Sequence, residues 1–430
     1  MAEPLRLALA GLGTVGTGVI RLLDENRHLV EARAGRSVEI VAVTARDRGR
    51  DRGVDLSGFA WEDDMASLAA REDVDVVVEL VGGSDGPALA LARRVLGGGR
   101  HLVTANKAMI AHHGAELAEL AAQNGVALAF EAAVAGGIPV LKGLREGAVA
   151  NGVSRVYGIL NGTCNYILSD MEKSGRAFAE VLGEAQALGY AEADPAFDIE
   201  GVDAAHKLAI LAAMAFGTKV DFAGVETIGI TAVRAEDIAQ AEALGFVIRL
   251  VGMADMQDGG LFQRVAPCLV PRDHPLAAVT GPTNAVVIEG NYAGRLLFQG
   301  AGAGDGPTAS AVVADIIDIA RSCRAAPFSV SVDALQLAGR ADPGTRRNRA
   351  YLRFAVPDRP GVMAELTAAM RDAGVSIESL IQQGRPKEGG EVLVAMVTHE
   401  GPESAVAAAL ALLDGSGSMA EPPLVLRLLG

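Results

Sequence analysis

A glycine-rich turn close to the N-terminus constrains the fold of this chain more than any other feature. An apolar segment at residues 5–10 leads directly into the sequence GLGTVG at residues 11–16. In a strand–turn–helix unit of this kind, the first glycine permits a tight turn, the second lets backbone N–H groups approach a pyrophosphate, and the third lets the helix pack against the strand. The free N–H groups of the helix N-terminus then face the phosphates. The predicted dinucleotide contacts are Gly11, Gly13, Thr14, Val15 and Gly16.

Segments typical of strands and of helices alternate through the first third of the chain. Strands are expected at residues 5–10, 38–43, 74–81, 101–104 and 126–130, and helices at 88–96 and 114–123. This alternation predicts an α/β domain with a parallel, doubly wound sheet of the Rossmann type. Ligands bind beyond the carboxyl ends of such strands, so one cleft is expected where the following loops converge: Gly11, Thr44, Gly82, Thr104 and Glu131.

Arginines after the second expected strand suggest which cofactor the chain prefers. Arg46 lies in this loop, and further arginines follow at positions 48, 50 and 52. An NAD site usually has an acidic residue here, whereas arginine can pair with the 2′-phosphate of NADP. We therefore predict a preference for NADP(H), with Arg46 as the leading contact. Asp47 leaves use of NAD(H) open, and a solvated charged loop is the alternative.

Residues 136–305 differ from the first part and predict a second, α+β domain for substrate binding and dimerisation. Strands are expected at 153–160 and 285–290, with helices between them. A glycine-rich stretch at 300–308 ends this segment, and the next helix begins with Gly-Pro-Thr. Gly304 is therefore a candidate for a second edge of the cofactor site, with an interdomain hinge as the alternative. Residues 306–340 are expected to complete the dinucleotide-binding domain of residues 1–135.

The last part of the chain predicts a complete small domain. Residues 341–349 belong to a polar, turn-rich stretch typical of a linker. Residues 350–430 then follow the order βαββαβ, which is the ferredoxin-like arrangement. The expected elements are strands at 351–356, 375–382, 391–398 and 424–429, helices at 362–373 and 402–413, and a polar turn at 384–390.

Two lysines are the main candidates for chemistry. Lys107 follows the strand expected at 101–104, in a loop. Lys207 lies in an apolar helix four residues after Asp203, so these two side chains share a face. Carboxylates beside a lysine suit the binding of an amino group while a carbonyl oxygen is protonated, as the reduction of an aldehyde by a nicotinamide cofactor requires. An ordinary helix ion pair is the alternative. The carboxylates that precede it are Glu192, Asp194, Asp198 and Glu200.

Composition excludes several classes of function. The formal net charge is -15, which argues against a nucleic-acid partner. The N-terminus lacks the pattern of a signal peptide, and the apolar runs are too short to span a membrane. Cys164, Cys268 and Cys323 are far apart, so we expect neither a disulfide framework nor a zinc cluster. A cytoplasmic protein with two or three domains is expected.

These motifs together resemble those of the homoserine dehydrogenase family over nearly the whole chain. The turn at 11–16 resembles its cofactor loop, and residues 79–83 and 104–107 resemble the loops that flank its nicotinamide. EAAVAGGIP at 131–139 resembles the segment that joins its two domains. NGTCNYIL at 161–168 resembles a family hallmark in which Cys164 is usually Thr. Residues 192–195 and 203–207 resemble its substrate and catalytic segment.

The resemblance implies interconversion of L-aspartate 4-semialdehyde and L-homoserine with NAD(P)H. It implies that Lys207 donates or accepts the proton, and that Lys107 assists at the carbonyl and contacts the cofactor. Other implied cofactor contacts are Gly82 and Thr104, and the implied substrate contacts are Glu192, Asp203 and Asp198. It also implies a monovalent cation, typically Na⁺, bound near the hinge by Glu131 and the carbonyls of Val134, Gly136 and Ile138.

Residues 350–430 resemble an ACT domain, with DRPGV at 358–362 at the turn where such domains bind amino acids. The resemblance implies L-threonine as effector, with Asp358 and Gly361 as candidate contacts; a dimer-forming module without a ligand is the alternative. A monofunctional chain is expected, because no aspartate kinase segment precedes the dehydrogenase motifs. A homodimer or homotetramer is also expected. Two other interpretations stay open: another Rossmann dehydrogenase with an ACT tail, and a non-catalytic sensor of a nucleotide and an amino acid.

Overall fold

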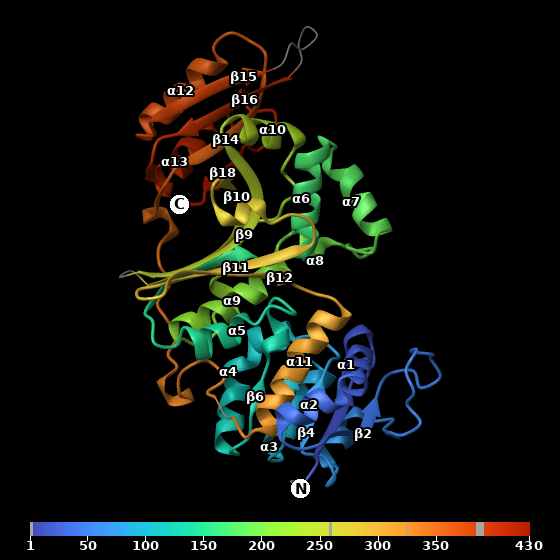
Figure 1. The fold of residues 1–430 in the computed structure, drawn as a ribbon. Coiled ribbons are helices and arrows are strands. Elements are labelled where there is room, and N and C mark those ends of the chain that lie inside the picture. The colour runs from blue at the N-terminus through green and yellow to red at the C-terminus, as the bar shows by residue number, and fades with distance from the viewer. Residues whose placement is uncertain (1–2, 258–259, 324, 384–390) are drawn as a thin grey trace.

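The structure is a computed structural model that describes residues 3–257, 260–323, 325–383 and 391–430. The N-terminal part lies at one end of an elongated molecule, a sheet-rich middle part follows, and the C-terminal part lies at the other end (Figure 1). The polar turn predicted at 384–390 falls outside the described residues. In the described ranges, no helix combines the length and the apolar character that crossing a membrane requires.

A parallel sheet forms the N-terminal part and confirms the predicted Rossmann fold class. Its strand order is β3-β2-β1-β4-β5-β6, and each neighbouring pair runs parallel. The order reverses between β1 and β4, which is where ligands bind in sheets of this type. The strands are β1 (Leu5–Ala10), β2 (Val38–Thr44), β3 (Ala60–Trp61), β4 (Val76–Glu79), β5 (His101–Thr104) and β6 (Leu128–Ala129).

Helices cover both faces of this sheet. They are α1 (Thr14–Glu25), α2 (Arg27–Ala34), α3 (Pro87–Gly97), α4 (Lys107–Gln123) and α11 (Asp305–Ala320). Side chains alternate along β1, so its leucines pack with α1, α2 and α11, whereas Ala8 and Ala10 pack with α3 and α4. Helix α11 follows the middle part in sequence but returns to lie beside α1 (Figure 1).

An antiparallel sheet forms the core of the middle part, with the strand order β12-β11-β7-β9-β10. Helices α6 and α9 pack against it. The strands are β7 (Val153–Ile159), β9 (Phe246–Gln257), β10 (Gly260–Pro271), β11 (Thr283–Gly290) and β12 (Gly294–Ala301). The other elements are α5 (Val140–Lys142), α6 (Gly162–Ser174), α7 (Phe178–Ala187), α8 (Ala196–Ile199), α9 (Val202–Phe216), β8 (Glu226–Thr227) and α10 (Ala235–Ala243).

The β9–β10 hairpin corrects the expectation that only helices separate residues 160 and 285. Most side chains of β10 are buried, whichever face of the sheet they point to. Apart from Gln263 and Arg264, its residues form a nearly continuous apolar run. The alternation that identifies a half-buried strand is absent, and a run of this kind is hard to distinguish from a buried helix.

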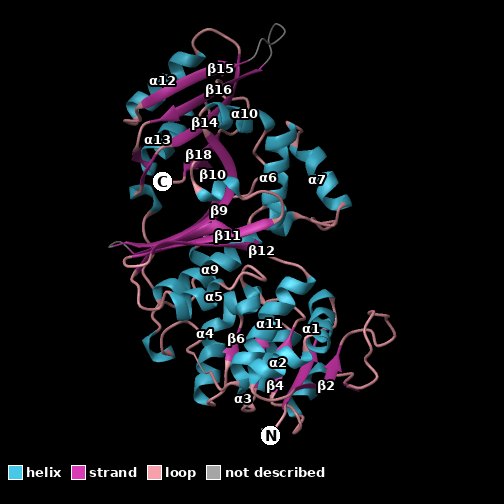
Figure 2. Cartoon of the chain, viewed as in Figure 1, coloured by secondary structure: helices cyan, strands magenta, loops and turns pink. Residues whose placement is uncertain are grey.

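The C-terminal part has the predicted βαββαβ order, with the strand order β18-β14-β16-β15. Its elements are β14 (Ala350–Pro357), α12 (Val362–Asp372), β15 (Ile377–Gln383), β16 (Glu391–Thr398), α13 (Glu403–Leu413) and β18 (Leu424–Leu428). Strand β18 also pairs with β10, through Cys268 opposite Arg427 and Leu269 opposite Leu428. The middle and C-terminal sheets are thus continuous (Figure 2), which the sequence analysis did not anticipate.

The stretch expected to be a linker is packed against its neighbours. Within it, β13 (Arg347–Asn348) pairs with β17 (Gly401–Pro402). The guanidinium of Arg346 lies 2.8 Å from the carboxylate of Asp255, on β9. These contacts, together with the shared sheet, hold the C-terminal part firmly against the middle part. The exact domain boundaries stay predictions.

Candidate active site

A cavity of about 610 Å³ lies between the glycine turn of the N-terminal part and the middle part. Segments that are far apart in the sequence meet around it. Of the predicted site residues, those that line it are Val15, Lys107, Gly136, Glu192, Asp198, Asp203, Lys207 and Gly304. Residues to which the sequence analysis gave no role also line it, among them Asn161, Gly162, Thr163, Tyr190, Asn284, Gly302 and Thr308.

The glycine turn has the geometry that a bound pyrophosphate needs. Gly11 has a φ of +104°, and a Cβ there would lie 2.7 Å from the carbonyl oxygen of Leu80. A Cβ on Gly16 would lie 2.1 Å from the carbonyl oxygen of Gly11, so α1 packs too closely against the turn for a side chain. At Gly13, by contrast, no described atom lies within 4 Å of the Cβ position. The turn is closed on the protein side and open where phosphates would approach.

Lys107 and Lys207 meet at the carboxylate of Asp203. Nζ of Lys107 lies 2.8 Å from Oδ1 of Asp203, and Nζ of Lys207 lies 2.8 Å from Oδ2. Lys207 also donates to the carbonyl oxygen of Leu160, directly after β7, at 2.8 Å. The helix ion pair considered as an alternative is therefore present. Both residues of this pair line the cavity, and a second lysine, Lys107 from α4, contacts the same carboxylate.

The electrostatics of Asp203 follow from this arrangement. Its side chain is 6% exposed. Burial alone would raise the pKa of Asp203, but the ammonium groups of Lys207 and Lys107 outweigh burial and hold that pKa well below its usual range. Asp203 is therefore ionised at neutral pH, and it fixes the positions of both ammonium groups at one wall of the cavity.

A second carboxylate, Asp198, is tied to the same cluster by Asn161. Nδ2 of Asn161 donates to Oδ1 of Asp198 at 2.9 Å and to Oδ2 of Asp203 at 2.8 Å. The hydroxyl of Thr163 lies 3.0 Å from Oδ2 of Asp198. The sequence signal that could have singled out Asn161 is its position before a helix, because Asn is a favoured N-cap residue.

Lys107 begins α4, which corrects its predicted place in a loop. Asn106 caps this helix: its Oδ1 accepts the N–H of Met109 at 3.0 Å, and its Nδ2 donates to the carbonyl of Gly83 at 2.8 Å. The ammonium of Lys107 also lies 5.8 Å from the ring centroid of Phe197, within reach of a cation–π attraction. The first helical residue thus carries its ammonium to the cavity from a rigid element.

Comparison with known proteins matches nearly the whole length of the chain. The NAD-binding domain of homoserine dehydrogenase matches residues 11–131, the homoserine dehydrogenase family matches residues 139–317, and the ACT domain matches residues 350–413. A homoserine dehydrogenase of Pseudomonas aeruginosa is 42% identical over 431 residues, which are 99% of each chain. The chain belongs to the homoserine dehydrogenase family. The predicted family is confirmed, and the protein is an oxidoreductase with homoserine dehydrogenase activity.

Solved structures of the homoserine dehydrogenase family have the same fold. The homoserine dehydrogenase of Thiobacillus denitrificans superposes with a TM-score of 0.92, at 41% identity, over 99% of this chain and 98% of that one. A hyperthermophilic archaeal homoserine dehydrogenase in complex with NADPH has a TM-score of 0.63, at 27% identity, over 74% of this chain and 98% of that one.

Glu79 organises the two loops that are expected to flank the nicotinamide in this homoserine dehydrogenase. Its buried Oε2 accepts the hydroxyl of Thr104 at 2.6 Å, and its Oε1 accepts the N–H groups of Val81 and Gly82 at 2.7 and 3.1 Å. Neither Thr104 nor Gly82 is among the described residues that line the cavity. Their contacts with the cofactor stay predictions, and Glu79 is the residue that sequence reasoning missed here.

Arg46 is exposed just beyond the end of β2. Its side chain has no hydrogen bond or ion pair with any described residue. Arg52, by contrast, donates to the carbonyl oxygen of Leu12 at 3.2 Å and lies 5.7 Å from the ring centroid of Trp61. Arg52 therefore braces the loop against the glycine turn, while Arg46 is left available for a ligand.

The residues predicted to hold a cation lie where the chain passes into the middle part. The buried carboxylate of Glu131 accepts the N–H groups of Leu141 and Lys142, at 3.0 and 2.8 Å. Burial, with the nearby carboxylate of Asp315, raises the pKa of Glu131 to about 8. These two N–H groups hold the Glu131 carboxylate in place, and its predicted role as a cation ligand stays a prediction. In the described ranges, no cluster of three or more His, Cys, Asp or Glu side chains suits a metal ion.

The proposed effector turn lies between β14 and α12. Asp358 and Gly361 are both exposed there. Gly361 has a φ of +99°, which side chains disfavour, so a glycine is needed for the chain to enter α12. The turn is remote in sequence from both lysines.

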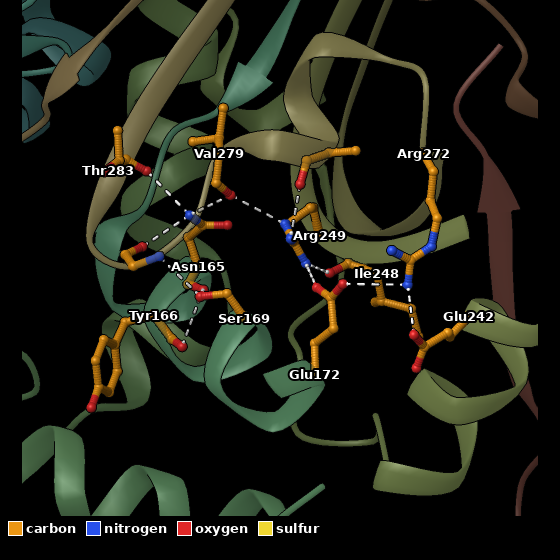
Figure 3. Close-up of polar contacts among 12 residues, drawn as sticks. Asn165, Tyr166, Ser169, Glu172, Glu242, Ile248, Arg249, Arg272, Val279 and Thr283 are labelled. Carbon is orange, nitrogen blue, oxygen red and sulfur yellow. Dashed lines mark hydrogen bonds and ion pairs between the residues drawn. The ribbon is translucent and has the colours of Figure 1, made fainter. Parts of the chain in front are cut away.

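A second cavity, of about 640 Å³, lies beside α6 and has a different character. Figure 3 shows Arg249 and Arg272 of this cavity paired with Glu172 and Glu242. Arg249 contacts Glu172 at 2.8 Å and the backbone carbonyl of Ile248 at 2.9 Å, and Arg272 lies 3.0 Å from Glu242. None of the predicted site residues is among the described residues that line it. The candidate active site is therefore the cavity that contains the two lysines.

Proposed function

We propose that this homoserine dehydrogenase reduces L-aspartate 4-semialdehyde reversibly to L-homoserine, with NADPH as its preferred cofactor. The observation that carries the proposal is the contact of Lys107 and Lys207 with Asp203 at the cavity wall. When bound, the nicotinamide supplies the hydride, and the carbonyl oxygen must also gain a proton. A substrate that lies between the lysines and the glycine turn meets both requirements.

Lys207 is the proposed proton donor. Its side chain is only 10% exposed, and Asp203 and the Leu160 carbonyl hold its Nζ in place. In the oxidation of homoserine, the same nitrogen in its neutral form accepts the hydroxyl proton. The side chain of Lys107 is 32% exposed, and its positive charge stabilises the negative charge that develops on the substrate oxygen.

The carboxylates at the cavity suit the ammonium group of an amino-acid substrate. Asp203 is already engaged by both lysines, which leaves Glu192 and Asp198 with the most capacity for a further cation. Glu192 forms no ion pair with any described residue, and Asp198 accepts from neutral donors only. We propose that Glu192 and Asp198 contact the substrate ammonium and that Asp203 completes this polar wall.

The preference for NADP(H) rests on Arg46. Its exposed guanidinium lies beyond β2, where the adenosine ribose binds in sheets of this type. A 2′-phosphate there would form a charge-assisted pair with Arg46. The archaeal relative solved with NADPH supports this proposal. Use of NAD(H) stays possible, because Asp47 is the adjacent residue.

Two further proposals concern ions and effectors. We propose that Na⁺ binds to Glu131 and to the carbonyls of Val134, Gly136 and Ile138. In support, no described backbone N–H donates to the carbonyl of Val134 or Gly136. We also propose that L-threonine binds at the turn of Asp358 and Gly361 and lowers activity. Assembly as a homodimer or homotetramer and a cytoplasmic location stay expectations from the sequence.

The proposed mechanism is tested by oxidation of homoserine with NADP⁺, comparing the wild type with Lys207→Met. We expect kcat to fall by about 10²–10⁴-fold, the usual contribution of a positioned proton donor. Lys219→Met is the matched control, because this lysine is 41% exposed and lies on the surface near Glu119. Near-normal turnover of a folded Lys207→Met enzyme would remove Lys207 from the mechanism.

A further inference from the structure

Asn161 occupies a position from which one side chain reaches both the helix α6 and the lysine–carboxylate cluster. It follows Leu160, whose carbonyl holds Lys207, and it directly precedes α6. It is 4% exposed. Its Oδ1 accepts the N–H of Cys164 at 2.8 Å, which is the usual N-cap bond. Its Nδ2 is then left facing two carboxylates.

The orientation of this amide follows from its partners. Asp198 and Asp203 accept hydrogen bonds and, when ionised, cannot donate them. The N–H of Cys164 can only donate. The amide oxygen must therefore face the helix, and both hydrogens of Nδ2 must face the carboxylates, at 2.9 and 2.8 Å. An aspartate at this position could cap the helix but could not donate to the two carboxylates. A serine could also cap the helix, but its side chain is too short to reach both carboxylates as well.

We propose that Asn161 is a positioning residue that holds Asp203 so that each carboxylate oxygen faces one lysine. Oδ2 of Asp203 accepts from both Asn161 and Lys207, and Oδ1 accepts from Lys107. By bridging Asp198 and Asp203, the amide also keeps two carboxylates side by side that would otherwise repel each other. This inference rests on the proposed roles of the lysines and adds the residue that sets their geometry.

The donor role predicts an unusual response to Asn161→Asp. This variant keeps the shape and the helix cap but replaces the donor with a third carboxylate. At pH 8 we expect a loss of about 10²-fold in kcat, comparable to the effect of misplacing catalytic groups by an ångström. Burial and the neighbouring carboxylates of Asp198 and Asp203 should raise the pKa of the carboxyl group introduced by the substitution. As the pH falls toward 6, this group gains a proton and can donate again, so the ratio of variant to wild-type kcat should rise. The charged or titratable groups around the amide are Lys107 from α4, Cys164 from α6, Glu192 from the loop before α8, Asp198 from α8, and Asp203 and Lys207 from α9.

Comparing Asn161→Asp with Asn161→Ser and with Asn151→Asp separates a role in positioning Asp203 from a role in capping α6. Asn161→Ser keeps a cap and lacks the reach, so it should lose kcat without any recovery at low pH. Asn151→Asp is the matched control for charge, because the Oδ1 of this asparagine also accepts a backbone N–H, that of Ala293 at 2.7 Å, but the residue lies outside the cavity lining. NADPH binding, followed by its fluorescence, should be unchanged in Asn161→Asp if the fold is intact.

The outcomes are distinct. If Asn161→Asp keeps at least half of the wild-type kcat at pH 8, the side chain only caps α6 and the inference is wrong. A loss of kcat that is equal at pH 6 and pH 8 also overturns the donor role. Failure of the proposed lysine chemistry would appear elsewhere, as near-normal turnover of Lys207→Met.

Discussion

Lys107 and Lys207 donate to opposite oxygens of one carboxylate, that of Asp203, each at 2.8 Å. Lys107 begins α4 in the N-terminal part, and Lys207 lies on α9 in the middle part. The two charges are therefore side by side only while these parts of the molecule are in contact. Asp203 joins the two parts of the molecule at this point, because its buried carboxylate pairs with both ammonium groups at the cavity wall.

Cofactor choice should depend on Arg46. We expect Arg46→Ala to raise the KM for NADPH by about tenfold or more, the loss of one charge-assisted contact, and to change the KM for NADH little. Arg347→Ala is the control, since this arginine is 62% exposed and pairs with Glu400 at 3.1 Å, away from the cofactor. A ratio of the two KM values that is the same in wild type and Arg46→Ala would exclude the contact.

L-Threonine should inhibit the full-length enzyme, and Asp358→Asn should weaken that inhibition by at least about tenfold, because a carboxylate paired with an ammonium is a strong contact. The measurement is the threonine concentration that halves homoserine oxidation. Asp414→Asn, which changes an exposed aspartate of the same domain, is the control and should be inhibited like the wild type. Wild-type enzyme that ignores threonine would show that the ACT domain does not sense it.

A buried ion pair between Arg353 and Asp237 joins the C-terminal part to the middle part, and its loss should destabilise the protein. The carboxylate of Asp237 on α10 accepts from Arg353 at 2.6 Å and from the hydroxyl of Tyr351 at 3.0 Å, and its side chain is 0% exposed. Arg353→Met leaves this charge without its partner, so we expect the free energy of unfolding to fall by about 3–5 kcal/mol. Urea unfolding measures it. Arg347→Met, which removes an exposed ion pair, should change it by about 1 kcal/mol or less.

Protonation of His206 should lower the free energy of unfolding at mildly acidic pH. Its ring stacks on Phe222 with centroids 4.2 Å apart, and burial lowers the pKa of His206. The folded pKa lies below the unfolded value of about 6.5, so this stability is complete above that pH and is lost as the pH falls through the folded pKa. Between pH 7 and 5, the free energy of unfolding measured in urea should therefore fall more steeply for the wild type than for His206→Phe.

A parallel dependence on pH in wild type and His206→Phe would contradict this assignment. His28→Gln is the matched control, because His28 is exposed on α2. That variant should keep the wild-type dependence on pH.

Local patterns predicted much of the fold. Helix spacing predicted the pair of Asp203 and Lys207, and the glycine turn predicted the strand–helix unit at the N-terminus. Both rest on residues that are close in sequence and whose geometry is set by the backbone. The β9–β10 hairpin was missed because burial on both faces removes the alternation that identifies a strand.

Asn161 and Glu79 show what local patterns do not reveal. Asn161 acts on Asp198 and Asp203 through distances that depend on how α8 packs beside both α6 and α9. Glu79 reaches Thr104 because β4 and β5 are neighbours in the sheet. Neither contact follows from the spacing of residues along the chain.

By itself, the sequence determined the order of the strands and helices of the N-terminal and C-terminal parts, the glycine turn and the family of the protein, because local backbone preferences and motif order are properties of neighbouring residues. Only the tertiary structure decided that Lys107 joins Asp203 and Lys207, and that β18 continues the sheet from β10. Those relationships depend on long-range packing, in which buried apolar area and backbone hydrogen bonds bring distant segments together.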